Sequence, residues 1–298
     1  MPCPEQIVIS ASRRTDIPAF YMDWFMGRIA AGFFDVVNPY NGRIRRVPAD
    51  AGRVHTIVFW SKNFGRFLAG GYGERLTAAG YHLFFNFTIN SRNKLLEPNL
   101  PPLEERLDQL RRLADHFGTR RIHWRFDPVC FYSSRNGERK DNLGDFETIA
   151  DTAAATGIST CITSFMDFYK KIARRAAAIP GFSFVDPGLK EKSAKIQWLE
   201  AVLAPRGIAL QACCEKDLLS ALPPESTVTA SACVPGGLFM SLDGGAVSLK
   251  KDAGQRRSAG CGCTVSMDIG GYREHPCFHD CLFCYANPAS HKSGRQQP

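Results

Sequence analysis

Three cysteines near the end of the chain have the residue type and spacing that could do chemistry. Cys277, Cys281 and Cys284 are spaced C-x3-C-x2-C, and the aromatic Phe283 comes just before the last of them. Three thiolates on one tight loop can bind three irons of a cubane iron–sulfur cluster and leave the fourth iron without a protein ligand. Electron-transfer clusters and structural zinc sites are instead closed by four ligands. The loop therefore predicts an open coordination position, and an open position indicates chemistry.

Two other interpretations of this loop stay open. A zinc knuckle would use Cys277, His279, Cys281 and Cys284, because zinc accepts Cys3His sets. An iron–sulfur electron carrier would need a fourth protein ligand for each cluster. The C-x3-C-x2-C spacing with its aromatic favours iron–sulfur over zinc, since zinc hairpins typically use C-x2-C.

The spacing and the aromatic resemble the cluster loop of the radical S-adenosylmethionine (SAM) superfamily. The string from Cys281 to Asn287 is most similar to the branch that includes the spore photoproduct lyases. This resemblance implies a [4Fe–4S] cluster whose free iron chelates the amino and carboxylate groups of SAM. Reductive cleavage of SAM then supplies a radical that abstracts hydrogen from a substrate. A reducing partner such as flavodoxin or ferredoxin is implied as well.

The position of the loop in the chain indicates which family the protein resembles most. Radical SAM enzymes usually carry it near the N-terminus, after the first strand of a (β/α)6 barrel, whereas here it lies close to the end of the chain. Together with Ser10–Pro18, this order resembles an uncharacterised bacterial domain-of-unknown-function family. The C-terminal cysteine cluster of that family is similar to the N-terminal cluster of radical SAM proteins. The resemblance implies a class of cofactor and leaves the substrate and the catalytic residues unassigned.

A second set of cysteines could bind another metal centre. Cys214, Cys233, Cys261 and Cys263 could close around an auxiliary iron–sulfur cluster or around zinc. The alternative is that cysteines such as Cys213, Cys214 and Cys233 are small buried hydrophobic residues, as free cysteine often is.

The composition of the chain limits the classes of protein to which it can belong. The chain has 298 residues, 11 cysteines and a formal net charge of +8. It contains neither a long apolar run nor a signal-peptide pattern, so we expect no membrane span and a cytoplasmic location where thiols stay reduced. The positive charge favours anionic partners such as nucleotides or nucleic acid, although solubility explains it equally well.

Apolar runs alternate with amphipathic segments along most of the chain. Glycine ends each of four such segments, at Gly80, Gly118, Gly157 and Gly207, which is typical of helix C-termini. Strands alternating with helices predict an α/β fold with a parallel sheet, either doubly wound or a partial barrel. Neither G-x-G-x-x-G nor a P-loop is present, and the resemblance favours a partial (β/α)6 TIM-like barrel. The six predicted strands cover residues 7–11, 55–60, 81–88, 121–126, 158–163 and 208–213.

After residue 222 the composition becomes rich in glycine, proline and cysteine. We therefore predict a barrel over residues 1–222, an irregular Cys-rich cap over 223–290 that packs on the barrel mouth, and a disordered tail over 291–298.

Polar residues follow the predicted strands, and in βα barrels functional residues gather at the carboxyl ends of strands. Arginine or lysine could bind the SAM carboxylate, and aspartate could bind its ribose or amino group. Phe283 could pack on the adenine or shield the cluster. The candidate cofactor-binding residues are therefore Arg13, Asp16, Lys62, Asn63, Arg125, Asp127 and Phe283.

Overall fold

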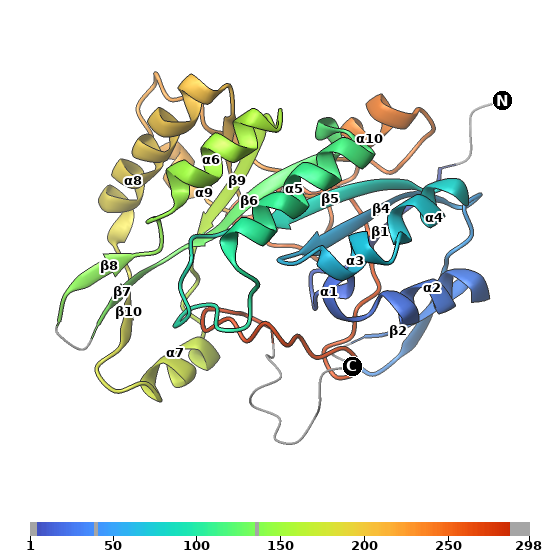
Figure 1. The fold of residues 1–298 in the computed structure, drawn as a ribbon, viewed down its shortest axis with the longest axis horizontal. Coiled ribbons are helices and arrows are strands. Elements are labelled where there is room, and N and C mark those ends of the chain that lie inside the picture. Colours follow the sequence, from blue (N-terminus) through green and yellow to red (C-terminus); the bar gives the residue numbers. More distant parts are fainter. Residues whose placement is uncertain (1–4, 39–40, 135–136, 287–298) are drawn as a thin grey trace.

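The centre of the molecule is an eight-stranded parallel sheet (Figure 1). The computed structural model describes residues 5–38, 41–134 and 137–286. The strand order is β12-β11-β9-β6-β5-β4-β1-β13, and all the neighbouring pairs are parallel. The strands are β1 (Ile7–Ala11), β4 (Val54–Ser61), β5 (His82–Thr88), β6 (Ile122–Val129), β9 (Thr160–Phe165), β11 (Ala209–Ala212), β12 (Thr229–Ala230) and β13 (Met267–Asp268).

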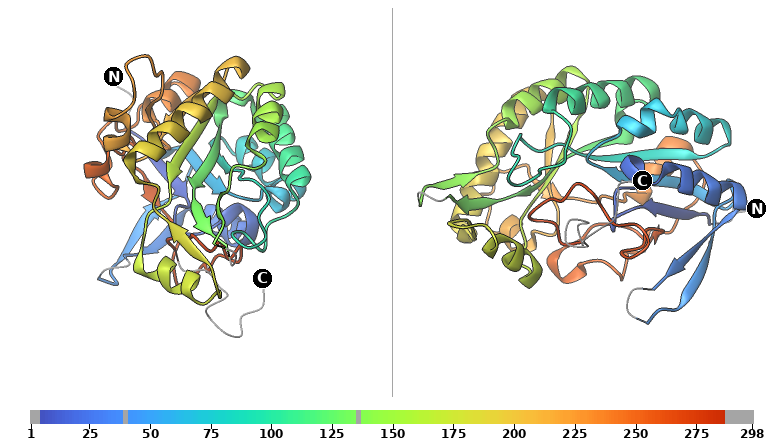
Figure 2. Two further views of the ribbon diagram at one scale, coloured as in Figure 1. Left: turned by 90° about the vertical axis from the view of Figure 1, so that its left-hand side faces the viewer. Right: turned by 60° about the horizontal axis from the view of Figure 1, so that its bottom comes forward.

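Most of the helices pack on the outer, convex face of this curved sheet, whereas the segment after residue 222, which includes α10 (Gly236–Asp243), lies on its inner face and α7 (Lys170–Ala177) packs beside the cysteine loop (Figure 2). The other helices are α1 (Ile17–Phe20), α2 (Met22–Ala31), α3 (Gly65–Ala69), α4 (Tyr72–Ala78), α5 (Leu103–Phe117), α6 (Phe146–Ala155), α8 (Gly188–Leu203) and α9 (Lys216–Ser220). Short 3-10 turns lie at Thr119–Arg121, Ala204–Arg206 and Arg257–Ala259.

Successive side chains along a strand of the sheet pack into two different hydrophobic cores. Ile57 and Phe59 of β4 belong to the large core beneath the helices, whereas Val58 belongs to the core of the inner face. This alternation follows from the two-residue period of a strand. The inner core joins Val8, Val58, Phe84 and Ile162 of the sheet to residues after position 222, including Cys233, Val234, Phe239, Val247 and Cys263.

Two small antiparallel sheets were absent from the sequence-based prediction. One is the hairpin of β2 (Phe33–Val37) and β3 (Ile44–Pro48). The other joins β7 (Phe131–Ser133), β8 (Arg139–Asp141) and β10 (Ser183–Val185).

All six predicted strands are present and parallel, which confirms the α/β assignment. From β1 to β11 the strands cross the sheet in chain order, so this part lacks the reversal of strand order that defines a doubly wound fold. The four predicted helix-ending glycines all have positive φ, from 68° at Gly207 to 90° at Gly80.

The segment after residue 222 is less irregular than the predicted cap. It contributes α10 and two edge strands, β12 and β13, to the fold. The division into domains at residue 222 stays a prediction, and the predicted tail, 291–298, lies outside the described residues. Among the described helices, none combines the length and apolar character that crossing a bilayer requires.

Candidate functional site

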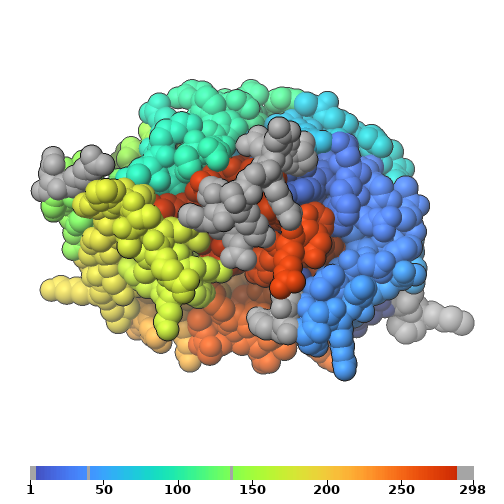
Figure 3. Space-filling view, turned by 90° about the horizontal axis from the view of Figure 1, so that it is seen from below, coloured from blue at the N-terminus to red at the C-terminus, as the bar shows by residue number. Residues whose placement is uncertain are grey.

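The cysteine loop docks at the carboxyl edge of the parallel sheet. β13 pairs with β1, and the chain then runs past the ends of the central strands, where it surfaces among N-terminal and middle segments (Figure 3). The backbone N–H of Leu282 donates to the carbonyl of Leu96 at 2.8 Å, and the Asn99 amide donates to the carbonyl of Phe278 at 2.9 Å. The loop is therefore held by the segment that links β5 to α5.

The three loop cysteines lie in a shared, water-poor environment. Cys281 is 5% exposed and packs with Leu282, Phe283 and Cys130, while Cys277 and Cys284 are partly buried. Burial raises the pKa of all three thiols. For Cys281 the Lys62 charge opposes this rise, and for Cys284 the charges of Arg175 and Lys62 do so.

Asp16 joins the start of α1, the end of β4 and the cysteine loop. Its buried carboxylate accepts hydrogen bonds from the backbone N–H groups of Ala19 at 3.0 Å and Lys62 at 2.8 Å. It also accepts from the Ser61 hydroxyl at 2.8 Å and lies 2.8 Å from Nε2 of His279. These contacts occupy both carboxylate oxygens, so Asp16 positions the loop.

Lys62 brings a positive charge to the loop. Its Nζ lies 2.6 Å from Oε1 of the buried Glu97 and 5.3 Å from the centre of the Phe283 ring. Oε1 of Glu97 is in turn 3.7 Å from Sγ of Cys281. Glu97 and Cys281 raise the pKa of Lys62 against the lowering effect of its burial. The lysine is therefore held charged beside the cysteines.

A second polar group surrounds Trp60. The guanidinium groups of Arg13 and Arg125 lie 5.0 and 5.3 Å from its ring centre. Arg125 donates to Asp127 at 2.5 Å, and Asp127 also accepts from the Ser164 hydroxyl. Trp60 lies at the end of β4, two residues before Lys62, so the two polar groups adjoin at the sheet edge.

Asn63 does not join either group. Its side-chain oxygen accepts from the backbone N–H of Gly65 and from the Gln109 amide of α5, both at 2.9 Å. Asn63 therefore fastens the start of α3 to α5, and its role as a cofactor ligand stays a prediction.

The second cysteine group is also brought together, with one additional member. Sγ of Cys213 lies 3.8 Å from Sγ of Cys214 and 3.9 Å from Sγ of Cys233. Cys233 and Cys263 belong to the core of the inner face, and Cys213 and Cys261 pack against it. We call Cys213, Cys214, Cys233, Cys261 and Cys263 the five-cysteine group.

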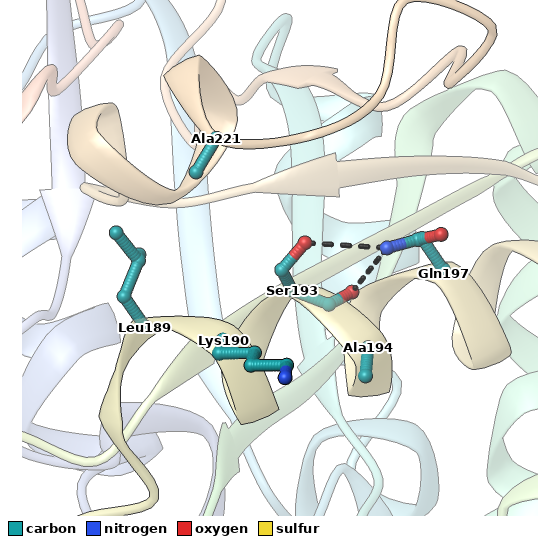
Figure 4. A pocket seen from close by; sticks show the side chains of 6 residues that line it. All are labelled: Leu189, Lys190, Ser193, Ala194, Gln197 and Ala221. Atoms are coloured by element: carbon teal, nitrogen blue, oxygen red, sulfur yellow. Dashed lines mark hydrogen bonds between the residues drawn. The ribbon is translucent and has the colours of Figure 1, made fainter.

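Neither cysteine group has the form of a finished ion-binding site. Among residues 5–38, 41–134 and 137–286, no three or more His, Cys, Asp or Glu side chains already surround a common metal position. A shallow hollow on α8, lined by residues such as Leu189, Ser193 and Ala221, shares no residue with either cysteine group (Figure 4).

Several site residues were missed by reasoning from the sequence. Glu97 lies in a connecting segment without a motif, and Asp268 of β13 accepts hydrogen bonds from the Ser12 hydroxyl at 2.6 Å and the Arg13 backbone at 2.7 Å. His279 entered the sequence interpretation only as a ligand of the zinc-knuckle alternative, and its contact with Asp16 was not expected; it is only 3% exposed. Its position inside the C-x3-C motif was the signal available. Cys213 was signalled only by its neighbour, Cys214.

The domain described as "Domain of unknown function (DUF1848)" matches residues 8–286, nearly the whole chain. The protein belongs to the DUF1848 family. A comparison with curated proteins finds no match. The DUF1848 match spans the sheet, the loop and the five-cysteine group together, so it supports the expected membership of a family of unknown function. Its chemistry must be argued from the side chains described above.

Proposed function

We propose that this DUF1848 protein is an iron–sulfur enzyme of the radical SAM type, built on a partial (β/α)6 barrel. The single observation that carries the proposal is the docking of the C-x3-C-x2-C loop at the carboxyl edge of the parallel sheet. This edge is where βα barrels gather their functional residues. The chain-order arrangement of β1 to β11 supports the partial barrel.

The donor set of the loop fits a cluster with one open corner. Cys277, Cys281 and Cys284 would hold a [4Fe–4S] cluster, which would supply the electron that cleaves SAM bound at the fourth iron. Buried thiols without a counter-charge are costly to ionise. Lys62 and Arg175 supply positive charge at Cys281 and Cys284 and so favour thiolate ligands there.

The surrounding side chains have separable roles in this proposal. Lys62, Arg13 and Arg125 are the cations that could bind a carboxylate or phosphate, and Asp127 is the acceptor for an amino or hydroxyl group. Phe283, at 6% exposure, shields the loop from water. Asp16 acts through His279 and Ser61 as a positioning residue.

The substrate class is argued only from charge. The net charge of +8 and the cations at the sheet edge favour a small anionic molecule, a nucleotide or a nucleic acid as substrate. A flavodoxin or ferredoxin would supply electrons, and the free thiols suit a reducing cytoplasm.

The test begins with anaerobic reconstitution using iron and sulfide, followed by dithionite and SAM and an assay for 5′-deoxyadenosine. The wild type and Cys161→Ala, which removes a buried cysteine outside both groups, should form the product. Cys281→Ala should not. A brown, redox-active wild-type protein that never cleaves SAM would remove the proposal.

One observation favours a second candidate function, a zinc-stabilised module that binds nucleic acid. His279 uses Nε2 on the Asp16 carboxylate, and its buried Nδ1 has no hydrogen-bond partner in the described structure. Metal-bound histidines commonly pair their other ring nitrogen with a carboxylate in this way. Nδ1 could therefore complete a Cys3His zinc site, or close an iron–sulfur cluster that only transfers electrons.

Replacing the histidine separates these functions. In the radical SAM proposal, His279→Gln keeps its iron and still forms 5′-deoxyadenosine. In the zinc alternative, the wild type is colourless with one zinc per chain, and His279→Gln loses that zinc. Nucleic-acid binding by such a module should also weaken steeply as salt is raised.

A further inference from the structure

The five-cysteine group is assembled from three separate parts of the chain. Cys213 and Cys214 follow β11, Cys233 lies between β12 and α10, and Cys261 and Cys263 precede β13. The sulfur of Cys213 contacts those of Cys214 and Cys233, and Cys213, Cys233, Cys261 and Cys263 pack in the same inner core. Such convergence requires the folded sheet, because the segments are far apart in sequence.

We propose that the five-cysteine group is an all-thiolate metal centre, separate from the C-x3-C-x2-C loop. The two sulfur separations of 3.8 and 3.9 Å, from Cys213 to Cys214 and to Cys233, suit this role. Zinc–sulfur bonds of about 2.3 Å at tetrahedral angles put neighbouring sulfurs about 3.8 Å apart. Cys261 and Cys263, which pack in the same core, could supply further thiolates to zinc or to an iron–sulfur cluster. The shared chemistry is a thiophilic metal held by four of these cysteines.

Arginines compensate the negative charge that thiolates would bring. Nη1 of Arg125 lies 2.5 Å from Sγ of Cys233. Arg125 is buried, with 5% of its surface exposed. Arg13, whose Nη1 donates to the Ser266 hydroxyl at 3.1 Å, brings further positive charge to Cys263, and Arg256 does so for Cys214. Hydrogen bonds to ligand sulfurs and nearby charge are the usual surroundings of a thiolate metal site.

A purely packing role does not account for these surroundings. Cys161, which is fully buried in the outer core, packs among apolar side chains. The five-cysteine group instead has a buried arginine directed at a sulfur. Nη2 of Arg125 pairs with Asp127, and Nη1 is left with the sulfur of Cys233 as its acceptor. A neutral thiol is a weak acceptor for such a buried charged donor, whereas a thiolate is a strong one.

A metal here would fasten the C-terminal segment onto the inner face of the sheet. Cys233 and Cys263 already pack with Val8, Val58 and Phe84 of β1, β4 and β5. Metal ligation would tie that segment to the end of β11 and would also fix Arg125 and Arg13 beside Trp60. This role is independent of the reaction proposed for the loop.

Two variants of the full-length protein test the proposal. The loop variant replaces Cys277, Cys281 and Cys284 by alanine, and the second variant combines Cys233→Ala with Cys263→Ala. Iron, zinc and acid-labile sulfide are measured per folded chain after anaerobic purification. The loop variant should retain one metal centre, and the second variant should lose that centre while keeping the loop metal.

The two proposals fail in different ways. Equal metal content in the wild type and the Cys233→Ala/Cys263→Ala variant, or a folded loop variant without metal, overturns the five-cysteine centre. A loop variant with undiminished metal overturns the proposed function instead. Iron with sulfide identifies a cluster and zinc without sulfide identifies a single ion, and either one supports an all-thiolate centre.

Alkylation of the wild type covers the case in which the second variant does not fold. Cys214 and Cys261 are partly exposed, so N-ethylmaleimide can reach them unless a metal occupies their sulfurs. In the metal-loaded protein their modification should be at least about tenfold slower than after chelation, because a metal-bound thiolate is a poor nucleophile. Equal rates before and after chelation overturn the proposal. Cys161 is the internal control and should stay unmodified throughout.

Discussion

Removing the Asp16 carboxylate should strongly destabilise the protein and release the cysteine loop. Asp16→Ala deletes the acceptor for two backbone N–H groups, a buried hydroxyl and His279. A hydrogen bond to a charged group contributes about 1.5–3 kcal/mol, and the loss of an N-terminal helix cap costs about 1 kcal/mol. Because these contacts are coupled, their costs do not simply add. We expect the free energy of unfolding to fall by about 3–5 kcal/mol, comparable to breaking a buried ion pair.

Urea unfolding of the apoprotein measures this loss directly, and iron content after reconstitution measures the effect on the loop. Asp16→Asn keeps one acceptor oxygen and should lose less stability than Asp16→Ala. Asp35→Ala is the matched control, because Asp35 pairs with Arg46 on an exposed hairpin. An exposed pair of this kind contributes about 0–1 kcal/mol.

A free energy of unfolding for Asp16→Ala within about 1 kcal/mol of the wild type, the range of an exposed pair, would contradict this prediction. Indistinguishable alanine and asparagine variants would contradict it as well, because only asparagine retains an acceptor oxygen. Full iron content in the reconstituted Asp16→Ala protein would show that the loop binds its iron without the Asp16 contacts.

Two further predictions concern stability. Burial lowers the pKa of His123 from 6.5 to about 4, so the unfolded chain binds the proton more readily than the folded protein. The stability that is present above pH 6.5 is therefore lost as the pH falls toward 4, and the shift in pKa corresponds to about 3 kcal/mol. Between pH 7 and pH 4, urea unfolding should show a correspondingly smaller loss of stability for His123→Gln than for the wild type, and parallel pH profiles of the two proteins would contradict this prediction. In Gly262→Ala the new methyl would collide with the backbone carbonyl of Ser231, so we expect a loss of about 1–3 kcal/mol. Gly237→Ala, which meets open space inside α10, should instead be neutral or stabilising by thermal unfolding, and equal effects at the two glycines would refute the packing argument.

Elements with local signals could be predicted from the sequence alone. Runs such as Ile7–Ala11 and His82–Thr88 are apolar and bounded by polar residues, so strand propensity and burial agree at each. Gly80 and Gly157 mark helix ends because only glycine adopts positive φ without strain. The C-x3-C-x2-C spacing is local as well, and it indicated the candidate metal loop before any fold was known.

Which distant side chains meet depends on the folded sheet. Glu97 reaches Lys62, His279 reaches Asp16, and Asp268 reaches Ser12, across separations that no sequence periodicity encodes. These pairings arise because parallel strands bring their carboxyl ends to one edge while the C-terminal segment returns along the inner face. For the same reason, the contact of Cys213 with Cys233 depends on how distant segments pack on the sheet.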